Sequence, residues 1–116
     1  MTIVRIDSGA RMSQAVVYGG VVSTAGQVAK VTQGESVTAQ ATEILQSIDR
    51  LLNEAGSDKS RLLTAQIWLS DIQDFGEFNK VWDDWVAPDA APTRACVESK
   101  LVVPALKVEI AVTAAI

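Results

Sequence analysis

The sequence predicts an α+β protein in which about six strands form a mixed sheet and two helices cover one of its faces. Two long stretches carry the hydrophobic spacing of amphipathic helices, and shorter stretches rich in β-branched residues surround them. No linker, repeat or low-complexity tract interrupts the chain, and its glycines and prolines lie where elements are expected to end. A length of 116 residues fits one domain, so residues 1–116 are expected to fold as a single unit.

The first three strands are expected at residues 2–6, 14–17 and 21–25. The last two of these are β-branched runs separated by Tyr-Gly-Gly at residues 18–20. Two glycines between such runs indicate a β-hairpin. Residues 2–6 alternate only weakly, which is typical of a short edge strand.

Two helices are expected, the first at residues 36–55, where apolar residues recur along one buried stripe. Ser36 is placed to act as its N-cap, and Gly56 follows where a left-handed residue is favoured. The second helix is expected to begin at Asp74 as N-cap, with Glu77 completing a capping box. Its aromatic residues are predicted to lie along one side and fill the core: Phe75, Phe78, Trp82 and Trp85.

Three further strands are expected at residues 62–69, 93–98 and 107–113, which gives the order β-β-β-α-β-α-β-β. Two helices can cover only one face of a sheet of about six strands. The other face must therefore meet water or another subunit, and its mixture of small, apolar and charged residues favours a subunit interface.

Side-chain alternation assigns residues of the last two strands to the two faces. Val108, Ile110 and Val112 are expected to face the helices, and Glu109 is expected to face away from them. The same parity argument places Arg94 on the uncovered face, together with Glu109.

Composition excludes several classes of function. A net charge of −4 with ten scattered Lys and Arg residues disfavours a nucleic-acid surface. The chain has no histidine, which removes Ser-His and Cys-His catalysis and most zinc sites, and its single cysteine cannot form an internal disulfide. No apolar run approaches the ~20 residues of a membrane span, and the N-terminus lacks a signal-peptide pattern, so a cytoplasmic location is expected.

Four motifs, the last of them in two parts, resemble those of a known family when taken in order. Residues 13–15 read Ser-Gln-Ala, residues 25–28 read Ala-Gly-Gln-Val, and residues 71–79 begin Asp-Ile-Gln-Asp-Phe and end on Asn. Residues 91–98 read Ala-Pro-Thr-Arg-Ala-Cys-Val-Glu, and residues 107–110 read Lys-Val-Glu-Ile. Each motif alone is weak, but together they resemble the Rid (YjgF/YER057c/UK114) family over nearly the whole chain.

The resemblance implies a chorismate-mutase-like α+β fold and a homotrimer whose sheets form a central β-barrel. In that arrangement the helices lie outside, and three sites lie in the clefts between subunits. The activity known for much of the family is hydrolysis of reactive 2-imino or 2-enamino acids to 2-keto acids and ammonia. Because an imine is already electrophilic, the reaction is expected to need no covalent nucleophile, metal or cofactor.

The matched motifs make Arg94 the candidate anchor for the substrate carboxylate, because a guanidinium offers two parallel donors. Glu109 is the candidate for handling protons at the imine. Backbone N–H groups near Gly26 and Cys96 are expected to complete the carboxylate cradle. The plain alternatives are an interface salt bridge for Arg94, a surface or interface carboxylate for Glu109 and a small packing residue at Cys96.

Three more positions are candidate substrate contacts. Asn79 ends a matched motif, although it can also be an ordinary helix-surface residue. Ala25 stands where many members of the family have Ser, and Met12 stands where many have Tyr. The loss of two hydroxyl groups makes the expected pocket more apolar and leaves the identity of the substrate open.

Three rival functions remain. The same trimer can bind a small carboxylate and regulate a partner protein without turnover, because Arg94 alone would suffice for binding. A pathway-specific deaminase acting on a larger, aminomuconate-type enamine would use the same site. A ribonuclease is disfavoured by the acidic charge, the absence of histidine and the lack of a basic stripe.

Overall fold

Six strands, two α-helices and two short 3-10 helices make up the computed structural model, which describes all residues 1–116. The strands are β1 (Val4–Ser8), β2 (Ser13–Tyr18), β3 (Val21–Thr24), β4 (Leu62–Leu69), β5 (Thr93–Glu98) and β6 (Val108–Ala115). The helices are α1 (Val37–Glu54), η1 (Lys59–Arg61), η2 (Ile72–Asp74) and α2 (Phe75–Trp85). Strands and α-helices follow the predicted order, and their limits lie within two residues of those expected.

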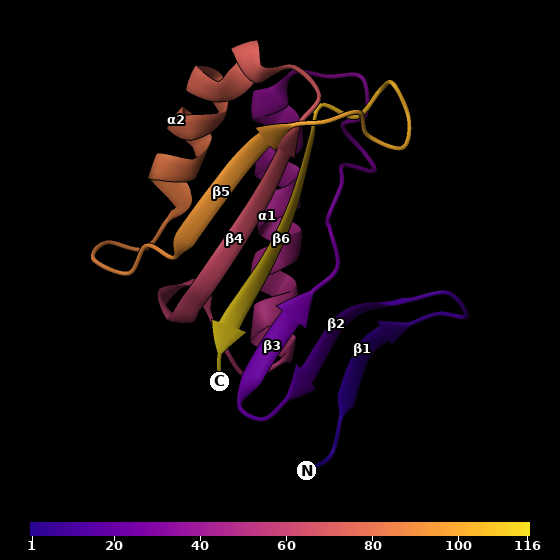
Figure 1. Cartoon of the computed structure of the whole chain (residues 1–116), viewed down its shortest axis with the longest axis vertical. Helices are drawn as coiled ribbons and strands as arrows, with labels where there is room; N and C mark the ends of the chain where they lie inside the picture. The colour runs from indigo at the N-terminus through magenta and orange to yellow at the C-terminus, as the bar shows by residue number, and fades with distance from the viewer.

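The strands form one sheet in the order β1-β2-β3-β6-β4-β5 (Figure 1). Strands β4 and β5 run parallel, because α2 connects them, and the other neighbours are antiparallel. Helices α1 and α2 both cover the same face of the sheet, so the opposite face is uncovered (Figure 1). The predicted α+β class, with a six-stranded mixed sheet and two helices on one face, is confirmed.

Helix α1 has the ends and the buried stripe that its sequence predicts. The Ser36 hydroxyl accepts a hydrogen bond from Ala39 N at 3.1 Å, and Gly56 adopts a left-handed φ of 85° after the helix ends. One side of α1 is almost fully buried against the sheet: Val37, Ala41, Ile44, Leu45, Ile48, Leu51 and Leu52. Neither α-helix is both long and apolar enough to cross a membrane.

Helix α2 begins differently from the prediction. Asp74 makes no side-chain capping bond, and Asp71 instead caps the preceding η2 turn by accepting from Gln73 N at 2.9 Å. The Glu77 carboxylate turns toward α1, where it accepts from Thr38 N at 3.3 Å and from Thr38 Oγ1 at 2.6 Å. The predicted capping box is therefore wrong, because η2 supplies the entry to α2 and Glu77 ties the two helices together.

The core lies between the sheet and the two helices. Val108, Ile110 and Val112 of β6 are at most 2% exposed on the helix side, as the alternation predicted. From α2, Phe78 and Trp82 pack into the same core, with ring centroids 6.2 Å apart. This packing fixes which face of β6 is turned toward the helices.

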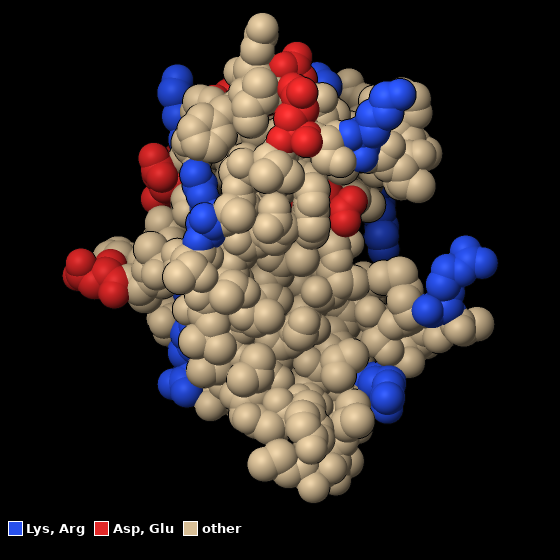
Figure 2. All heavy atoms as spheres, viewed as in Figure 1, with Lys and Arg blue, Asp and Glu red and all other residues tan.

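The uncovered face of the sheet carries few charges across its middle. Figure 2 looks onto this face and shows Lys, Arg, Asp and Glu mainly around its rim. A hollow of about 410 Å³ lies over the sheet, lined mainly by small or hydroxyl-bearing side chains: Ser23, Thr64, Ala95, Ala111 and Thr113. A gently hollowed face with few charges across its middle is more typical of an interface than of a solvated surface.

Candidate active site

Arg94 is an exposed arginine on the edge strand β5 whose charge has no counter-ion in the chain. Its Nη1 donates a hydrogen bond to Asn79 Oδ1 at 2.8 Å, which brings two predicted site residues together. Its guanidinium carbon lies 5.7 Å from the centroid of Phe75 and 5.5 Å from that of Trp82. The ion pairs of the chain all belong to Arg50, so the remaining donors of Arg94 are free for a ligand.

Cys96 lies two residues beyond Arg94 on the same side of β5, half-buried against the core. Burial raises the pKa of the Cys96 thiol, while the nearby Arg94 charge acts in the opposite direction. The sulfur is therefore a neutral thiol near pH 7, which matches the packing role considered from the sequence.

Glu109 is a half-buried carboxylate on β6 that makes no hydrogen bond or ion pair with another side chain. Burial raises the pKa of Glu109 above its ordinary value of 4.5. The carboxyl group lies directly against Gly26, where an added Cβ would overlap Oε2 and lie 2.8 Å from Cδ. Only glycine at position 26 leaves room for this side chain.

The backbone around Gly26 offers a free donor beside that carboxyl group. Ala25 N donates to Gln14 O and Gln27 N donates to Ile110 O, both at 2.8 Å. Gly26 N, between them, donates to no group of the chain. The Gln27 side chain stiffens this segment by donating to Gln14 Oε1 at 2.9 Å, a contact that sequence reasoning did not identify.

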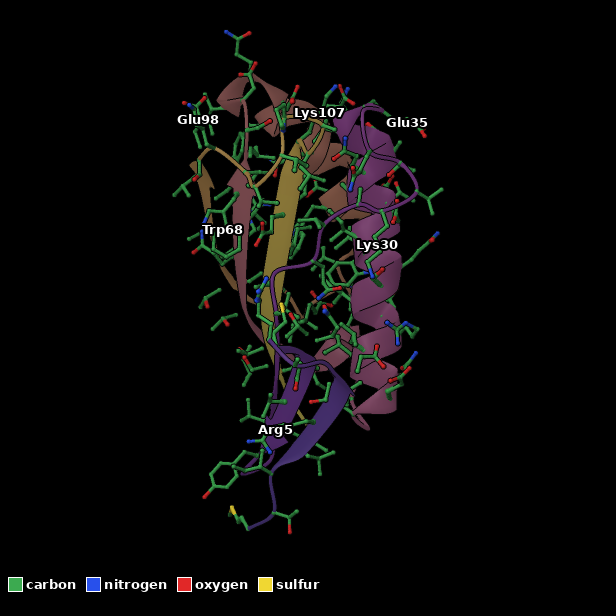
Figure 3. All side chains as sticks on the ribbon, turned by 90° about the vertical axis from the view of Figure 1, so that its right-hand side faces the viewer. Arg5, Lys30, Glu35, Trp68, Glu98 and Lys107 are labelled. Carbon is green, nitrogen blue, oxygen red and sulfur yellow. The ribbon has the colours of Figure 1, made fainter.

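Arg94 and Glu109 lie on opposite faces of the sheet in one chain. Strand pairing sets Arg94 beside Ala65 and Glu109 beside Trp68, and register neighbours share a face. Ala65 is buried under the helices, whereas Trp68 points away from α1 (Figure 3). The prediction that both charged residues share the uncovered face is therefore wrong. Because β5 is an edge strand, exposed along most of its length, its alternation does not report which side faces the core.

Met12 lies far from Arg94 in the chain. It follows the β1–β2 turn at one edge of the sheet, whereas Arg94 lies on β5 at the opposite edge. Met12 is 48% exposed and borders a separate hollow around that turn. The six other predicted site residues thus form two groups, one around Arg94 and one around Glu109, and Met12 stands apart from the Arg94 group.

Two aromatic residues belong to the surroundings of Arg94, although the sequence predicted only core positions for them. Trp82 is 5% exposed and forms the floor beneath the guanidinium, as a core residue can. Phe75 is 39% exposed, so its predicted place in the core is wrong. The signal that could have identified it is its position in the first turn of α2, four residues before Asn79 on the same helix side.

The fold and these two groups define a class of small α+β proteins that carry an unpaired arginine and an unpaired glutamate on opposite faces of one sheet. Residues 2–116 match the model of the family described as endoribonuclease L-PSP. The chain belongs to this family, also called the Rid or YjgF/YER057c/UK114 family, as its motifs indicated.

Similar proteins span the whole length of the chain. A RutC family protein from Haemophilus influenzae is 44% identical over 114 residues, which is 98% of each chain. RutC family protein YoaB from Escherichia coli is 41% identical over 118 residues, which is 100% of each chain. The crystal structure of a YjgF family member from Neisseria meningitidis has a TM-score of 0.95 at 41% identity, covering 99% of this chain and 95% of that one.

Proposed function

We propose that this protein hydrolyses reactive 2-imino or 2-enamino acids to 2-keto acids and ammonia, at sites formed between the subunits of a homotrimer. The observation that carries the proposal is a pair of uncompensated groups, the Arg94 guanidinium and the Glu109 carboxyl, on opposite faces of one sheet. One chain cannot bring them together. A second copy whose sheet edge crosses the uncovered face unites them in a single cleft.

A closed trimer explains why the sheet leaves one face and both edges uncovered. Three sheets that surround a common axis bury these faces in a barrel and leave the helices outside. Each site then takes three residues from one subunit, Arg94, Asn79 and Cys96, and the others from the next, Ala25, Gly26 and Glu109. Met12 belongs with the Glu109 group, because Gln14, two residues further along the chain, contacts Gln27 beside Gly26.

Arg94 is the anchor for the substrate carboxylate. Asn79 takes one of its donors and Trp82 supports its plane, so the guanidinium is held in place before a ligand arrives. Each hydrogen bond from a guanidinium to a carboxylate contributes roughly 1.5–3 kcal/mol. The free N–H of Gly26 supplies a further donor from the neighbouring subunit.

Glu109 handles the protons of the reaction. As water attacks the imine carbon, Glu109 removes a proton from it and passes that proton to the nitrogen, which gives a carbinolamine. Glu109 then removes the hydroxyl proton as the C=O bond forms and protonates the nitrogen, so the C–N bond breaks and ammonia leaves. A pKa raised by burial suits a carboxylate that must accept a proton and return it near neutral pH.

Two other functions are less well supported. An endoribonuclease, the activity in the family description, would need to bind an anionic polymer with a chain of net charge −4 and no histidine. A regulatory trimer that only binds a carboxylate needs Arg94 but gives no role to the half-buried Glu109. Hydrolysis accounts for both groups.

The decisive experiment generates imines with an amino-acid oxidase and traps them with semicarbazide. The wild-type protein should lower the rate of semicarbazone formation, and Arg94→Ala should remove this effect. Glu109→Gln should slow turnover by about 100-fold or more while a 2-keto acid still binds within about threefold of its wild-type affinity. Arg50→Ala removes an exposed arginine on α1 outside the site and should keep full activity.

Several outcomes would contradict the proposal. A wild-type protein that leaves the semicarbazone rate unchanged for every amino acid tested would favour the binding module. Full activity in Arg94→Ala would place the site elsewhere. Equal loss of ligand binding in both variants would remove the proton-handling role of Glu109.

A further inference from the structure

Phe75 presents an exposed aromatic surface next to the free guanidinium of Arg94. Its side chain is 39% exposed, whereas Phe78 and Trp82 on the same helix are at most 5% exposed. Trp82 already supports the guanidinium from the core side. The outer surface of Phe75 therefore has no packing partner within the chain, although it lies beside the only uncompensated arginine of the site.

The distance from Arg94 to Phe75 determines which part of a ligand meets the ring. A carboxylate held by two guanidinium hydrogen bonds places its carbon about 4 Å from the guanidinium carbon. The centroid of Phe75 lies 5.7 Å from that same carbon. Atoms two or more bonds beyond the carboxylate carbon can therefore contact the ring, and in a 2-imino acid those atoms are the imine nitrogen and the side chain, of which only the side chain is apolar.

We propose that Phe75 selects 2-imino acids with apolar side chains of three or more carbons, aliphatic or aromatic. This selectivity rests on the proposed function. Such side chains lose water against the ring, and each buried methylene improves binding by about fourfold. Alanine-derived imines are too short to cover the ring. Acidic side chains lose hydration there without gaining a hydrogen bond.

The other side of the expected site has the same character. Ala25 contributes a methyl group next to Gly26, and Met12 contributes a flexible thioether that adapts to apolar ligands of different shape. Neither residue offers a hydroxyl group to a polar side chain. The polar contacts of the site thus serve the carboxylate and the imine, and the remaining surface is apolar.

The test compares kcat/KM for imines made in situ by an amino-acid oxidase from alanine, leucine, methionine, phenylalanine and glutamate. The wild-type protein should prefer the leucine, methionine and phenylalanine imines over the alanine imine by about tenfold or more. Phe75→Ala should reduce that preference to about threefold or less, because the aromatic surface that separates long from short side chains is gone. Phe75→Leu should keep an intermediate preference, because it retains an apolar side chain.

Controls separate selectivity from assembly. Val102→Ala removes an 85% exposed apolar residue in the β5–β6 loop and should leave the preference unchanged. Sedimentation of Phe75→Ala should match that of the wild type. A variant that dissociates would instead make Phe75 a subunit contact and overturn its role in selectivity.

Calorimetry with 2-keto acids distinguishes this inference from the function it rests on. The wild-type protein should bind 4-methyl-2-oxopentanoate about tenfold more tightly than pyruvate, and Phe75→Ala should remove the difference. Imine turnover without any preference for apolar side chains, or a preference that survives in Phe75→Ala, would overturn the inference alone. A wild-type protein that hydrolyses no imine would overturn the proposed deaminase function. If that protein also bound the two keto acids equally well, the proposed apolar binding surface at Phe75 would be overturned too.

Discussion

At the scale of single residues, the contact between Gly26 and Glu109 links sequence to chemistry most directly. Glu109 rests where any side chain at position 26 would collide with it, and this close contact keeps its carboxyl group away from water. A carboxyl group with a raised pKa and a free backbone N–H thus lie side by side at this point of the chain.

Replacement of Gly26 by alanine should displace the Glu109 carboxyl group without unfolding the protein. The backbone at Gly26 does not need a positive φ, and the atoms that must move belong to the flexible end of Glu109. Turnover should fall on the order of 10- to 100-fold, while the free energy of unfolding changes by less than about 1 kcal/mol. Steady-state kinetics and urea denaturation measure these two quantities, and unchanged turnover would remove Glu109 from the reaction.

The pH dependence of turnover should report the environment of Glu109. The reaction needs the carboxylate form, so kcat should fall as the pH drops through a pKa above the ordinary 4.5. The same raised pKa makes the folded state more stable at lower pH, because the folded state still holds this proton at a pH where the unfolded state has released it. Stability should therefore decline as the pH rises from 4.5 through the folded pKa, and Glu109→Gln should abolish this decline.

At the scale of elements, the sequence predicted the structure correctly wherever the hydrophobic periodicity of an element coincides with its buried face. The buried stripe of α1, its Ser36 cap and the inward side of β6 were all predicted, because each is determined by residues within one element. The orientation of Arg94 was not predictable in this way. It depends on the pairing of β5 with β4, and an edge strand with little buried surface carries no alternation signal that reveals it.

The N-terminus of α2 is a second place where the local sequence did not determine the contacts. Asp74 and Glu77 have the spacing of a capping box, yet their partners are decided by η2 and by Thr38 on α1, which are not visible in a local window. Phe75 was placed in the core for the same reason. Its helical spacing matches that of Phe78 and Trp82, but it lies just beyond the part of α2 that the sheet covers.

Alanine at Gly76 should stabilise α2. Gly76 lies in the first turn of this helix with an ordinary negative φ, and a Cβ there meets nothing within 4 Å. Because alanine loses less conformational entropy than glycine in a helix, the free energy of unfolding should rise by about 0.5–1 kcal/mol. Thermal denaturation checks this, and a lower melting temperature would mean that this open surface is covered in the assembled protein.

Glu43 on α1 anchors the loop that leads from Gly26 to the helix. Its carboxylate accepts hydrogen bonds from the backbone N–H groups of Lys30 and Thr32 at 2.7 and 2.9 Å, and from Thr32 Oγ1 at 2.7 Å. Val31 N donates to it more weakly at 3.2 Å. Desolvation, the largest single effect, raises the pKa of Glu43, but these hydrogen bonds together outweigh it and lower the pKa to about 2.

Glu43→Gln should lower the free energy of unfolding by about 1 kcal/mol, because it weakens the hydrogen bonds that hold this loop. The effect is no larger because the carboxylate is partly solvated. The lowered pKa means that the stabilisation is complete above pH 4.5 and is lost as the pH falls from there toward about 2. Urea denaturation across this range should show a loss of stability in the wild type that is smaller in the variant. Identical pH profiles would mean that the loop is held by other contacts.

At the scale of the whole molecule, the sheet separates the two halves of the proposed site. Family membership and fold follow from the chain itself, whereas a complete site requires the face of one copy and the edge of another. Sequence motifs could name Arg94 and Glu109 but could not show that they belong to different halves. That division is a property of strand order, and under the proposed function it makes assembly a condition of activity.

Mixing two inactive variants tests this claim most directly. Arg94→Ala and Glu109→Gln should each be inactive as pure trimers, and trimers re-formed from equal amounts of both should regain about a quarter of the wild-type activity. The recovery arises because a mixed interface can pair an intact Arg94 from one subunit with an intact Glu109 from the next. If mixed trimers, verified by mass spectrometry, stay as inactive as the two parents, then both residues act from the same subunit and the shared site proposed here does not exist.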